Sequence, residues 1–441
     1  MKKNETYYII TIGCQMNKSD SERIAGYLED NGFALASSEI KANLVVLTTC
    51  GVRQSAEDRV YGFVGKIKKQ NPKAKIILTG CLSDRQDVRK RLGEQVDVWL
   101  NINDLPKLMS KLFGERKKNK PTSYLKIKPK YNSKISAFVP IGNGCDNFCA
   151  YCVVPYARGR EIYRPAQEIL KEVKDLVAKG CKEIVLIAQN VNSYVDVLKS
   201  TGSSRRRSAP PQDDRGIINF SKLLKKVNDV PGNFWIRFAT SHPKDMSDEL
   251  IKTIANCQKV CQHIHLPAQA GDDKILSAMN RKYTAAHYKN LIKKIRKAMP
   301  EAAITTDIIV GFPGETRKQF SNTIKLFKEI KFDMAYIAQY SPRFGTAAFK
   351  LKDDVSREEK KRREEELMKI LRKTALENNK KYLGKTTEVL VSGESKKREQ
   401  YGYTKTNKNV KIKMSNVKSG EFVKVKITKV EDFGMEGERV A

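Results

Sequence analysis

The sequence lacks any long apolar run, since none approaches the roughly 18 residues that a membrane-spanning helix needs. It also lacks a secretory signal. The N-terminal run from Tyr7 to Ile12 is shorter than the roughly seven to fifteen apolar residues of a signal peptide. Nine cysteines are an odd count in a chain without such a signal, which argues against a disulfide framework and favours metal or redox chemistry. We therefore expect a cytoplasmic protein with no membrane partner.

Acidic residues are few relative to basic ones. The chain has 84 Lys and Arg against 50 Asp and Glu, a net charge of +34. This excess predicts attraction to a polyanion, either nucleic acid or an acidic membrane surface, and the alternative is a set of solvated helix faces. The 40% hydrophobic and 30% charged residues are typical of a folded chain. At about 100 to 200 residues per domain, 441 residues predict two to four domains.

Short apolar strand patterns alternate with helical patterns in the first part of the chain. The strand patterns lie at residues 7–12, 44–47, 76–78 and 96–100, and they predict an open α/β sheet. Between Gly114 and Lys134 the periodicity fades into a stretch rich in Lys and Pro. We place an N-terminal domain at residues 1–115 and a basic linker at residues 116–134.

A second α/β region begins at Ile135. Strands expected at residues 137–141, 184–187, 235–238, 263–266, 304–310 and 334–337 predict a parallel barrel, full or partial, over residues 135–380. The stretch from Lys199 to Gly216 has the composition of a mobile loop, and we assign it no chemistry. After a long charged helix at residues 356–383, an alternating pattern predicts a small β-barrel at residues 381–441. The fold class is therefore α/β with a C-terminal β-barrel.

The strongest chemical signal is a group of three cysteines in the turn after the first expected barrel strand. These are Cys145, Cys149 and Cys152. A structural zinc site normally has four ligands, but the next cysteine is Cys181 and the first histidine is His242. Three soft ligands suit a 4Fe-4S cluster that leaves one iron open to a cofactor. The alternatives are an unusual zinc loop and a redox triplet.

A second group of three cysteines lies in the N-terminal domain. Cys14, Cys50 and Cys81 each come at the end of an expected strand. In an open α/β sheet the loops at these strand ends share one crevice, so the three thiols can meet. This predicts an auxiliary 4Fe-4S cluster, and the alternative is three independent buried thiols.

These residues carry a resemblance to a known family. The Cys-x-x-x-Cys-x-x-Cys loop resembles that of the radical SAM superfamily, whose members bind S-adenosylmethionine (SAM) at the open iron and cleave it to a 5′-deoxyadenosyl radical. Over nearly its full length the chain resembles the radical SAM methylthiotransferases. Residues 13–17, 144–156, 189–192 and 240–243 resemble the branch that acts on isopentenyladenosine in tRNA, and the tail resembles the TRAM RNA-binding barrel.

The resemblance implies a tRNA methylthiotransferase that modifies C2 of isopentenyladenosine at position 37. The cluster at Cys145, Cys149 and Cys152 would generate the radical, and the auxiliary cluster would hold the sulfide that a first SAM methylates. The expected partners are the tRNA anticodon stem-loop, a reductant protein such as flavodoxin or ferredoxin, and a sulfur donor, and the chain is expected to be a monomer. The alternatives are a methylthiotransferase for threonylcarbamoyladenosine or for a ribosomal protein aspartate, and a zinc-stabilised RNA-binding protein.

Weaker candidates lie outside the two cysteine groups. Tyr151, Gln189 and Arg237 are candidate contacts to SAM, with packing or structural hydrogen bonding as the alternative. Tyr401 and Tyr403 are candidates for stacking on unpaired bases. Several other residues are expected to be structural, namely His263 and His265 as a packed pair, residues 311–315 as a turn into a helix, and Cys181, Cys257 and Cys261 as non-ligands.

Overall fold

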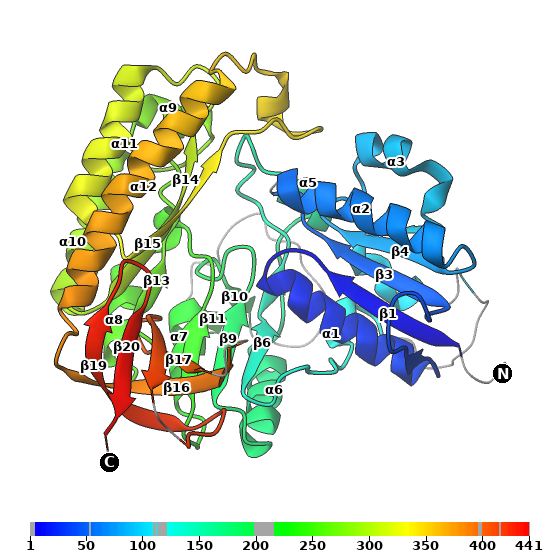
Figure 1. Cartoon of the computed structure of the whole chain (residues 1–441), viewed down its shortest axis with the longest axis horizontal. Coiled ribbons are helices and arrows are strands. Elements are labelled where there is room, and N and C mark those ends of the chain that lie inside the picture. The colour runs from blue at the N-terminus through cyan, green and yellow to red at the C-terminus, as the bar shows by residue number, and fades with distance from the viewer. Residues whose placement is uncertain are drawn as a thin grey trace. The chain divides into compact units, whose positions relative to one another are not determined.

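The computed structural model describes residues 5–52, 54–108, 112, 121–197, 216–395, 399–413 and 416–440 (Figure 1). The chain divides into two compact units. Unit 1 comprises Met1–Ser133, Asn143–Ile162 and Ser341–Lys352, and unit 2 comprises Lys134–Gly142, Tyr163–Tyr340 and Asp353–Ala441. The loop expected at residues 199–216 lies outside the described residues except for Gly216. Among the described helices, none has the length and apolar character required to span a membrane.

Unit 1 is built on a five-stranded parallel sheet, which confirms the expected open α/β sheet. The strand order is β2-β1-β3-β4-β5. The bounds are β1 Thr6–Thr11, β2 Ala34–Leu35, β3 Leu44–Thr49, β4 Lys75–Gly80 and β5 Val98–Leu100. The central strand β3 is buried at every position, because a parallel strand covered by helices on both faces must be apolar on both.

Two apolar clusters cover the two faces of this sheet. One joins Val46 to Ile24 and Leu28 of α1, and the other joins Val45 to Val60 of α2. Alternate residues of β3 therefore face opposite helices, as the period of two requires. The helices and 3₁₀ segments of unit 1 are α1 Gln15–Asp30, α2 Gln54–Gln70, α3 Gln86–Leu92, η1 Gly93–Gln95, η2 Ile102–Lys107, η3 Tyr124–Lys126, α5 Val154–Arg158 and η5 Ala347–Lys350.

Unit 2 contains a partial parallel barrel made from the six expected strands. One sheet pairs β9 Glu183–Ile187 with β6 Ser136–Pro140 and β12 Trp235–Phe238, and the other pairs β14 Ala303–Val310 with β13 His263–His265 and β15 Met334–Gln339. An isolated parallel bridge joins Ile236 of β12 to Val260, which lies three residues before β13. The remaining short strands are β7 Gly142–Asn143, β8 Ile162–Tyr163, β10 Val195–Val197 and β11 Ile217–Asn219.

Amphipathic helices follow the barrel strands along the chain. In α6, Ile169, Val173 and Leu176 are buried and form one apolar stripe, which is the packed face of this helix. The helices of unit 2 are α6 Ala166–Ala178, α7 Phe220–Asn228, η4 Pro243–Asp245, α8 Asp248–Asn256, α9 Asp273–Ala278, α10 Ala285–Ala298, α11 Arg317–Ile330 and α12 Arg357–Lys380.

The C-terminal residues of unit 2 form a closed β-barrel, as expected. Its strands run in the order β16-β17-β18-β20-β19, with bounds β16 Thr386–Glu394, β17 Gln400–Thr404, β18 Asn409–Lys413, β19 Phe422–Val430 and β20 Met435–Arg439. The barrel packs on the α/β strands through Leu390, which shares a buried cluster with Trp235 and Cys261. The rings of Trp235 and Phe422 lie 5.0 Å apart between centroids, so aromatic packing adds to this contact.

Candidate metal centre

The cysteines of the N-terminal domain follow three neighbouring strands of the parallel sheet. Cys14 comes after β1, Cys50 directly after β3, and Cys81 directly after β4. These strands are adjacent in the sheet, and parallel strands end at the same edge. The thiols of Cys14 and Cys81 are close enough to interact electrostatically. The three cysteines therefore lie at one edge of the sheet.

Two glycines allow the cysteine loops to approach one another closely. A Cβ added to Gly13 would lie 2.7 Å from the Cβ of Cys50, closer than real Cβ contacts occur. One added to Gly51 would lie 3.3 Å from the Cβ of Cys81. The loop at Gly13 therefore packs on Cys50, and the loop at Gly51 packs on Cys81, which links the three strand ends in a chain of contacts.

The second group of cysteines belongs to the same compact unit. Residues 143–162, which sequence patterns assign to the barrel domain, make their contacts within unit 1. Val153 and Ala157, just beyond the last cysteine of the loop, pack against Cys81. The thiols of Cys152 and Cys81 also interact electrostatically. The two cysteine groups are therefore neighbours. The domain boundaries expected from the sequence stay a prediction.

Hydrogen bonds fix the loop that carries the second group. The N–H of Cys145 donates to the Gly159 carbonyl at 3.1 Å, and the N–H of Cys152 donates to the Cys149 carbonyl at 3.0 Å. The side-chain amide of Asn147 donates to the sulfur of Cys145 at 3.5 Å. Phe148 has a φ of 45°, which is uncommon for a residue with a side chain. The loop is thus held in a defined and strained shape, as at many ligand sites.

Two thiols of this loop, those of Cys145 and Cys152, are difficult to deprotonate. Burial raises the pKa of Cys145 to about 11, and the nearby charges of Glu161 and Cys149 add to the shift. Burial also raises the pKa of Cys152, with further contributions from Cys149 and Cys145. A bound cation removes this penalty, because a coordinated thiol is deprotonated. The loop is therefore a set of donors suited to a positively charged metal centre.

The donor set fits an iron-sulfur cluster. Thiolate sulfurs are soft donors, and they are the usual protein ligands of iron-sulfur clusters. Each protein ligand of a 4Fe-4S cube binds a different iron, so the three sulfurs need not converge on one point. Within the described ranges, no three Cys, His, Asp or Glu side chains are arranged to hold a single metal ion.

Arg237, a candidate contact to SAM, is engaged in contacts inside unit 2. It lies in β12 and donates to the carboxylate of Glu183 at 2.6 Å and to the carbonyl oxygen of Thr404 at 2.7 Å. It also donates to the carbonyl of Lys405 at 3.3 Å. These bonds join the α/β strands to the C-terminal barrel. They favour the structural alternative for Arg237.

Gln189 and two neighbouring polar groups lack partners at the ends of barrel strands. Gln189 and Asn190 follow β9, and Ser241 comes three residues after β12. The side-chain oxygens of all three are buried, and within the described part of the chain none has a hydrogen-bond partner. A buried polar atom without a partner is costly, so these atoms mark a place for a polar ligand. Sequence reasoning assigned no role to Asn190 or Ser241, although both follow barrel strands.

The other candidates have structural surroundings. Tyr151 is half-buried in the cysteine loop. His263 and His265 both bond the Thr305 hydroxyl, at 3.1 and 3.0 Å, and this supports the packed role expected for the pair. Tyr403 interacts with Arg237 of the α/β barrel, so its contacts do not favour the base stacking that was expected.

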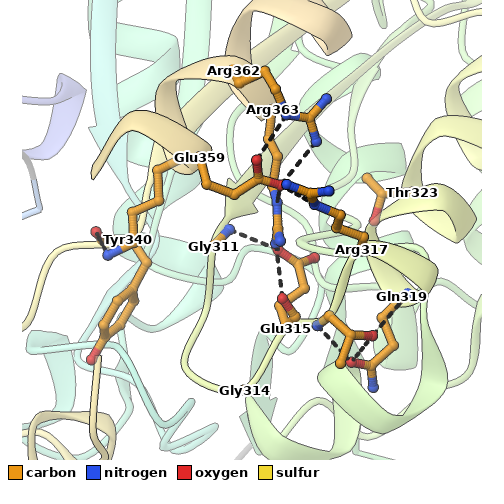
Figure 2. A network of polar contacts seen from close by, with 12 residues as sticks. Gly311, Gly314, Glu315, Arg317, Gln319, Thr323, Tyr340, Glu359, Arg362 and Arg363 are labelled. Atoms are coloured by element: carbon orange, nitrogen blue, oxygen red, sulfur yellow. Dashed lines mark hydrogen bonds and ion pairs between the residues drawn. The ribbon is translucent and has the colours of Figure 1, made fainter. Parts of the chain in front are cut away.

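The turn at residues 311–315 leads into α11, as expected. Figure 2 shows how the carboxylate of Glu315 accepts from the Gly311 N–H at 2.7 Å and from Arg363 of α12 at 2.8 Å. Burial raises the pKa of Glu315. Arg363 also donates to Glu359 at 2.9 Å. The N–H of Gly311 is thus bonded to the Glu315 carboxylate of the same turn. The bonds from Arg363 attach α12 to this turn.

Three family models match successive parts of the chain. Residues 6–101 match Uncharacterized protein family UPF0004, residues 139–327 match the Radical SAM superfamily, and residues 380–440 match the TRAM domain. A tRNA-2-methylthio-N(6)-dimethylallyladenosine synthase of Clostridium novyi (strain NT) is 42% identical over 454 residues, which cover 99% of this chain and 96% of the relative. The chain belongs to the tRNA-2-methylthio-N(6)-dimethylallyladenosine synthase family. Another synthase of this name, from Carboxydothermus hydrogenoformans, is 41% identical over 98% of this chain and 99% of the relative.

The synthase family has the fold of radical SAM enzymes. A radical SAM methyltransferase, TsrM from Kitasatospora setae, superposes with a TM-score of 0.52 and 13% identity over 78% of this chain and 77% of that one. This likeness concerns the fold alone. The radical SAM match implies SAM and one 4Fe-4S cluster.

Proposed function

We propose that this synthase transfers a methylthio group to C2 of isopentenyladenosine at position 37 of tRNA. The observation that carries the proposal is the likeness, over 99% of the chain, to a relative named tRNA-2-methylthio-N(6)-dimethylallyladenosine synthase. The net charge of +34 and the TRAM domain support tRNA as the substrate.

Cys145, Cys149 and Cys152 are the proposed ligands of the radical-generating cluster. When bound, a 4Fe-4S cluster with an open iron supplies the electron that cleaves SAM reductively. The chain's own part is to hold three sulfurs in a loop whose shape is fixed by backbone hydrogen bonds. Asn147 donates to the sulfur of Cys145 and stabilises its negative charge once a cluster is bound.

Cys14, Cys50 and Cys81 are the proposed ligands of the auxiliary cluster. This ligand assignment is supported by two observations. The three cysteines follow adjacent strands at one edge of the sheet, and their loops pack closely at Gly13 and Gly51. Cys50 and Cys81 are buried and Cys14 is exposed, so a group held there is shielded from water on the side of Cys50 and Cys81. Shielding protects a reactive sulfur from side reactions.

Gln189 and Tyr151 are proposed contacts of SAM. The side-chain oxygen of Gln189 is buried and accepts no hydrogen bond from the described residues. It can therefore accept one from an ammonium group. Tyr151 precedes the last cysteine of the loop, and its backbone is the proposed contact. Arg237 is not a proposed contact of SAM, because its N–H groups donate to Glu183 and Thr404.

The test is single-turnover methylthiolation of a synthetic anticodon stem-loop. The enzyme is reconstituted anaerobically with iron and sulfide and incubated with SAM, dithionite and a stem-loop that carries isopentenyladenosine. Nucleoside mass spectrometry should show the methylthio product for this substrate. Product from a stem-loop with threonylcarbamoyladenosine instead would overturn the substrate assignment.

Two variants test the ligand assignment in the same assay. Cys145→Ala should abolish SAM cleavage, because the proposed cluster loses a ligand. Cys181→Ala is the control, since Cys181 is a buried cysteine of unit 2 whose thiol donates to the Ile135 carbonyl at 3.3 Å. Equal loss in both variants would contradict the assignment.

A further inference from the structure

Arg158 is a buried arginine that the cluster ligands do not account for. It ends α5, the short helix after the Cys145–Cys152 loop, and only 2% of its surface is exposed. It donates to the side-chain oxygens of Asn143 at 3.0 Å and Asn17 at 3.1 Å, and to the Asp20 carboxylate at 2.6 Å. A buried cation needs such partners, because its removal from water is costly.

The same guanidinium lies beside the proposed ligands of the auxiliary cluster. It is close enough to the Cys81 thiol to interact electrostatically, and Ala157, the preceding residue, packs against Cys81. The Asn17 oxygen that accepts from Arg158 also lies 3.8 Å from the sulfur of Cys14, in a thiol hydrogen bond. Arg158 therefore lies near Cys81 and is linked to Cys14 through one side chain, that of Asn17.

Asp20 is the carboxylate that pairs with Arg158, and only one of its two oxygens is used in the pair. One carboxylate oxygen pairs with the guanidinium, and the other is buried without a partner among the described residues. The planar fork of an arginine can hold several acceptors in fixed directions at once, which an ammonium group cannot. The arrangement thus holds a guanidinium in a fixed orientation near the Cys81 sulfur.

We infer that Arg158 is a positioning residue for the auxiliary cluster, where it orients Cys14 through Asn17 and places a positive charge near the Cys81 sulfur. The inference rests on the proposed ligand assignment and deepens it. Hydrogen bonds to cluster sulfurs and nearby charge set the reduction potential of a cluster. Loss of Arg158 should therefore lower the potential, and loss of the Asp20 charge should raise it.

The experiment uses a full-length background in which Cys145, Cys149 and Cys152 are all replaced by alanine, so that it holds only the auxiliary cluster. Arg158→Met, Arg158→Lys and Asp20→Asn are each added to it. After anaerobic reconstitution, iron and acid-labile sulfide per chain, the visible spectrum and the reduction potential are measured. Thermal melting by circular dichroism reports whether each variant is folded.

Arg158→Met should hold severalfold less iron, and the remaining cluster should have a more negative potential. Arg158→Lys should recover part of the iron, because it restores the charge without the fork. Asp20→Asn should shift the potential in the positive direction. Opposite shifts for the two charge changes are not expected from a merely structural role.

Arg363→Met is the matched control in the same background. Arg363 is equally buried and paired with Glu315, but it belongs to unit 2. It should lower the melting temperature without changing iron content or potential. A folded Arg158→Met protein with full iron and an unchanged potential would overturn the inference. If Arg158→Met does not fold, an unchanged potential in Asp20→Asn would overturn it.

The ligand assignment has its own outcome in this experiment. If the background binds no iron while Arg158 is present, Cys14, Cys50 and Cys81 are not the ligands, and the assignment and the inference both fall. If the background binds iron and Arg158→Met changes neither the iron content nor the potential, only the role of Arg158 is overturned.

Discussion

Gly80 is the position where one added methyl group should most disturb the auxiliary site. It ends β4 directly before Cys81, and its φ is 92°. A Cβ at this position would lie 2.4 Å from the carbonyl oxygen of Thr49 and 2.8 Å from its nitrogen. Both atoms belong to the backbone of the neighbouring strand end, so neither can rotate away. Gly80→Ala must therefore move β4 away from Thr49 and shift Cys81 relative to Cys50.

The cost of Gly80→Ala has two parts. An alanine in a left-handed backbone conformation costs about 1 to 2 kcal/mol. Overpacking of a buried site costs about 1 to 3 kcal/mol more. The free energy of unfolding should therefore fall by roughly 2 to 5 kcal/mol, a large share of the roughly 5 to 15 kcal/mol that stabilises a typical domain.

Urea unfolding and iron content measure the two consequences separately. Gly80→Ala should unfold at lower urea and bind less iron after anaerobic reconstitution. Gly65→Ala is the matched control, because Gly65 lies inside α2 and an added Cβ would meet nothing within 4 Å. In a helix interior the change from glycine to alanine should stabilise by about 0.5 to 1 kcal/mol and leave the iron content unchanged. Wild-type stability and full iron in Gly80→Ala would refute the reasoning.

Three further predictions concern other parts of the chain. Arg237→Met leaves the half-buried Glu183 without its cationic partner and should cost up to about 3 to 5 kcal/mol in urea unfolding, whereas an unchanged midpoint would contradict the contact described. Hydrogen bonds from Arg362 and Arg363 lower the pKa of Glu359 from 4.5 to about 2, so its stabilisation is complete above about pH 4.5 and is lost as pH falls toward 2. Glu359→Gln should flatten the stability profile in that window, measured by urea unfolding at successive pH values, and identical profiles would count against this. Fluorescence anisotropy should show tRNA affinity falling steeply between about 50 and 200 mM salt, and a salt-independent affinity would argue against phosphate contacts.

The arrangement of the cysteines was predictable because each follows a strand. Alternation of apolar runs located β1, β3 and β4, and the end of a parallel strand fixes where the next residue lies. The C-terminal barrel was equally predictable, since the pattern Phe422–Val430 alternates between buried and exposed positions. The two-residue strand β2 carries too little periodicity to be found from sequence.

Contacts between distant segments were not predictable. The period of two places Arg237 on one face of β12, but it does not indicate that the C-terminal barrel covers that face. Arg158 meets Asn17 and Asp20 across more than 130 residues, and no local pattern links these positions. The buried oxygen of Gln189 is likewise a product of packing, which only the folded chain defines.

The most direct test of the account is the iron count of three proteins after anaerobic reconstitution. The wild type should bind about eight irons, since each of two clusters contains about four. A variant with alanine at Cys14, Cys50 and Cys81 and one with alanine at Cys145, Cys149 and Cys152 should each keep about four. The account would be contradicted if either variant bound as much iron as the wild type, or if the wild type bound zinc in place of iron.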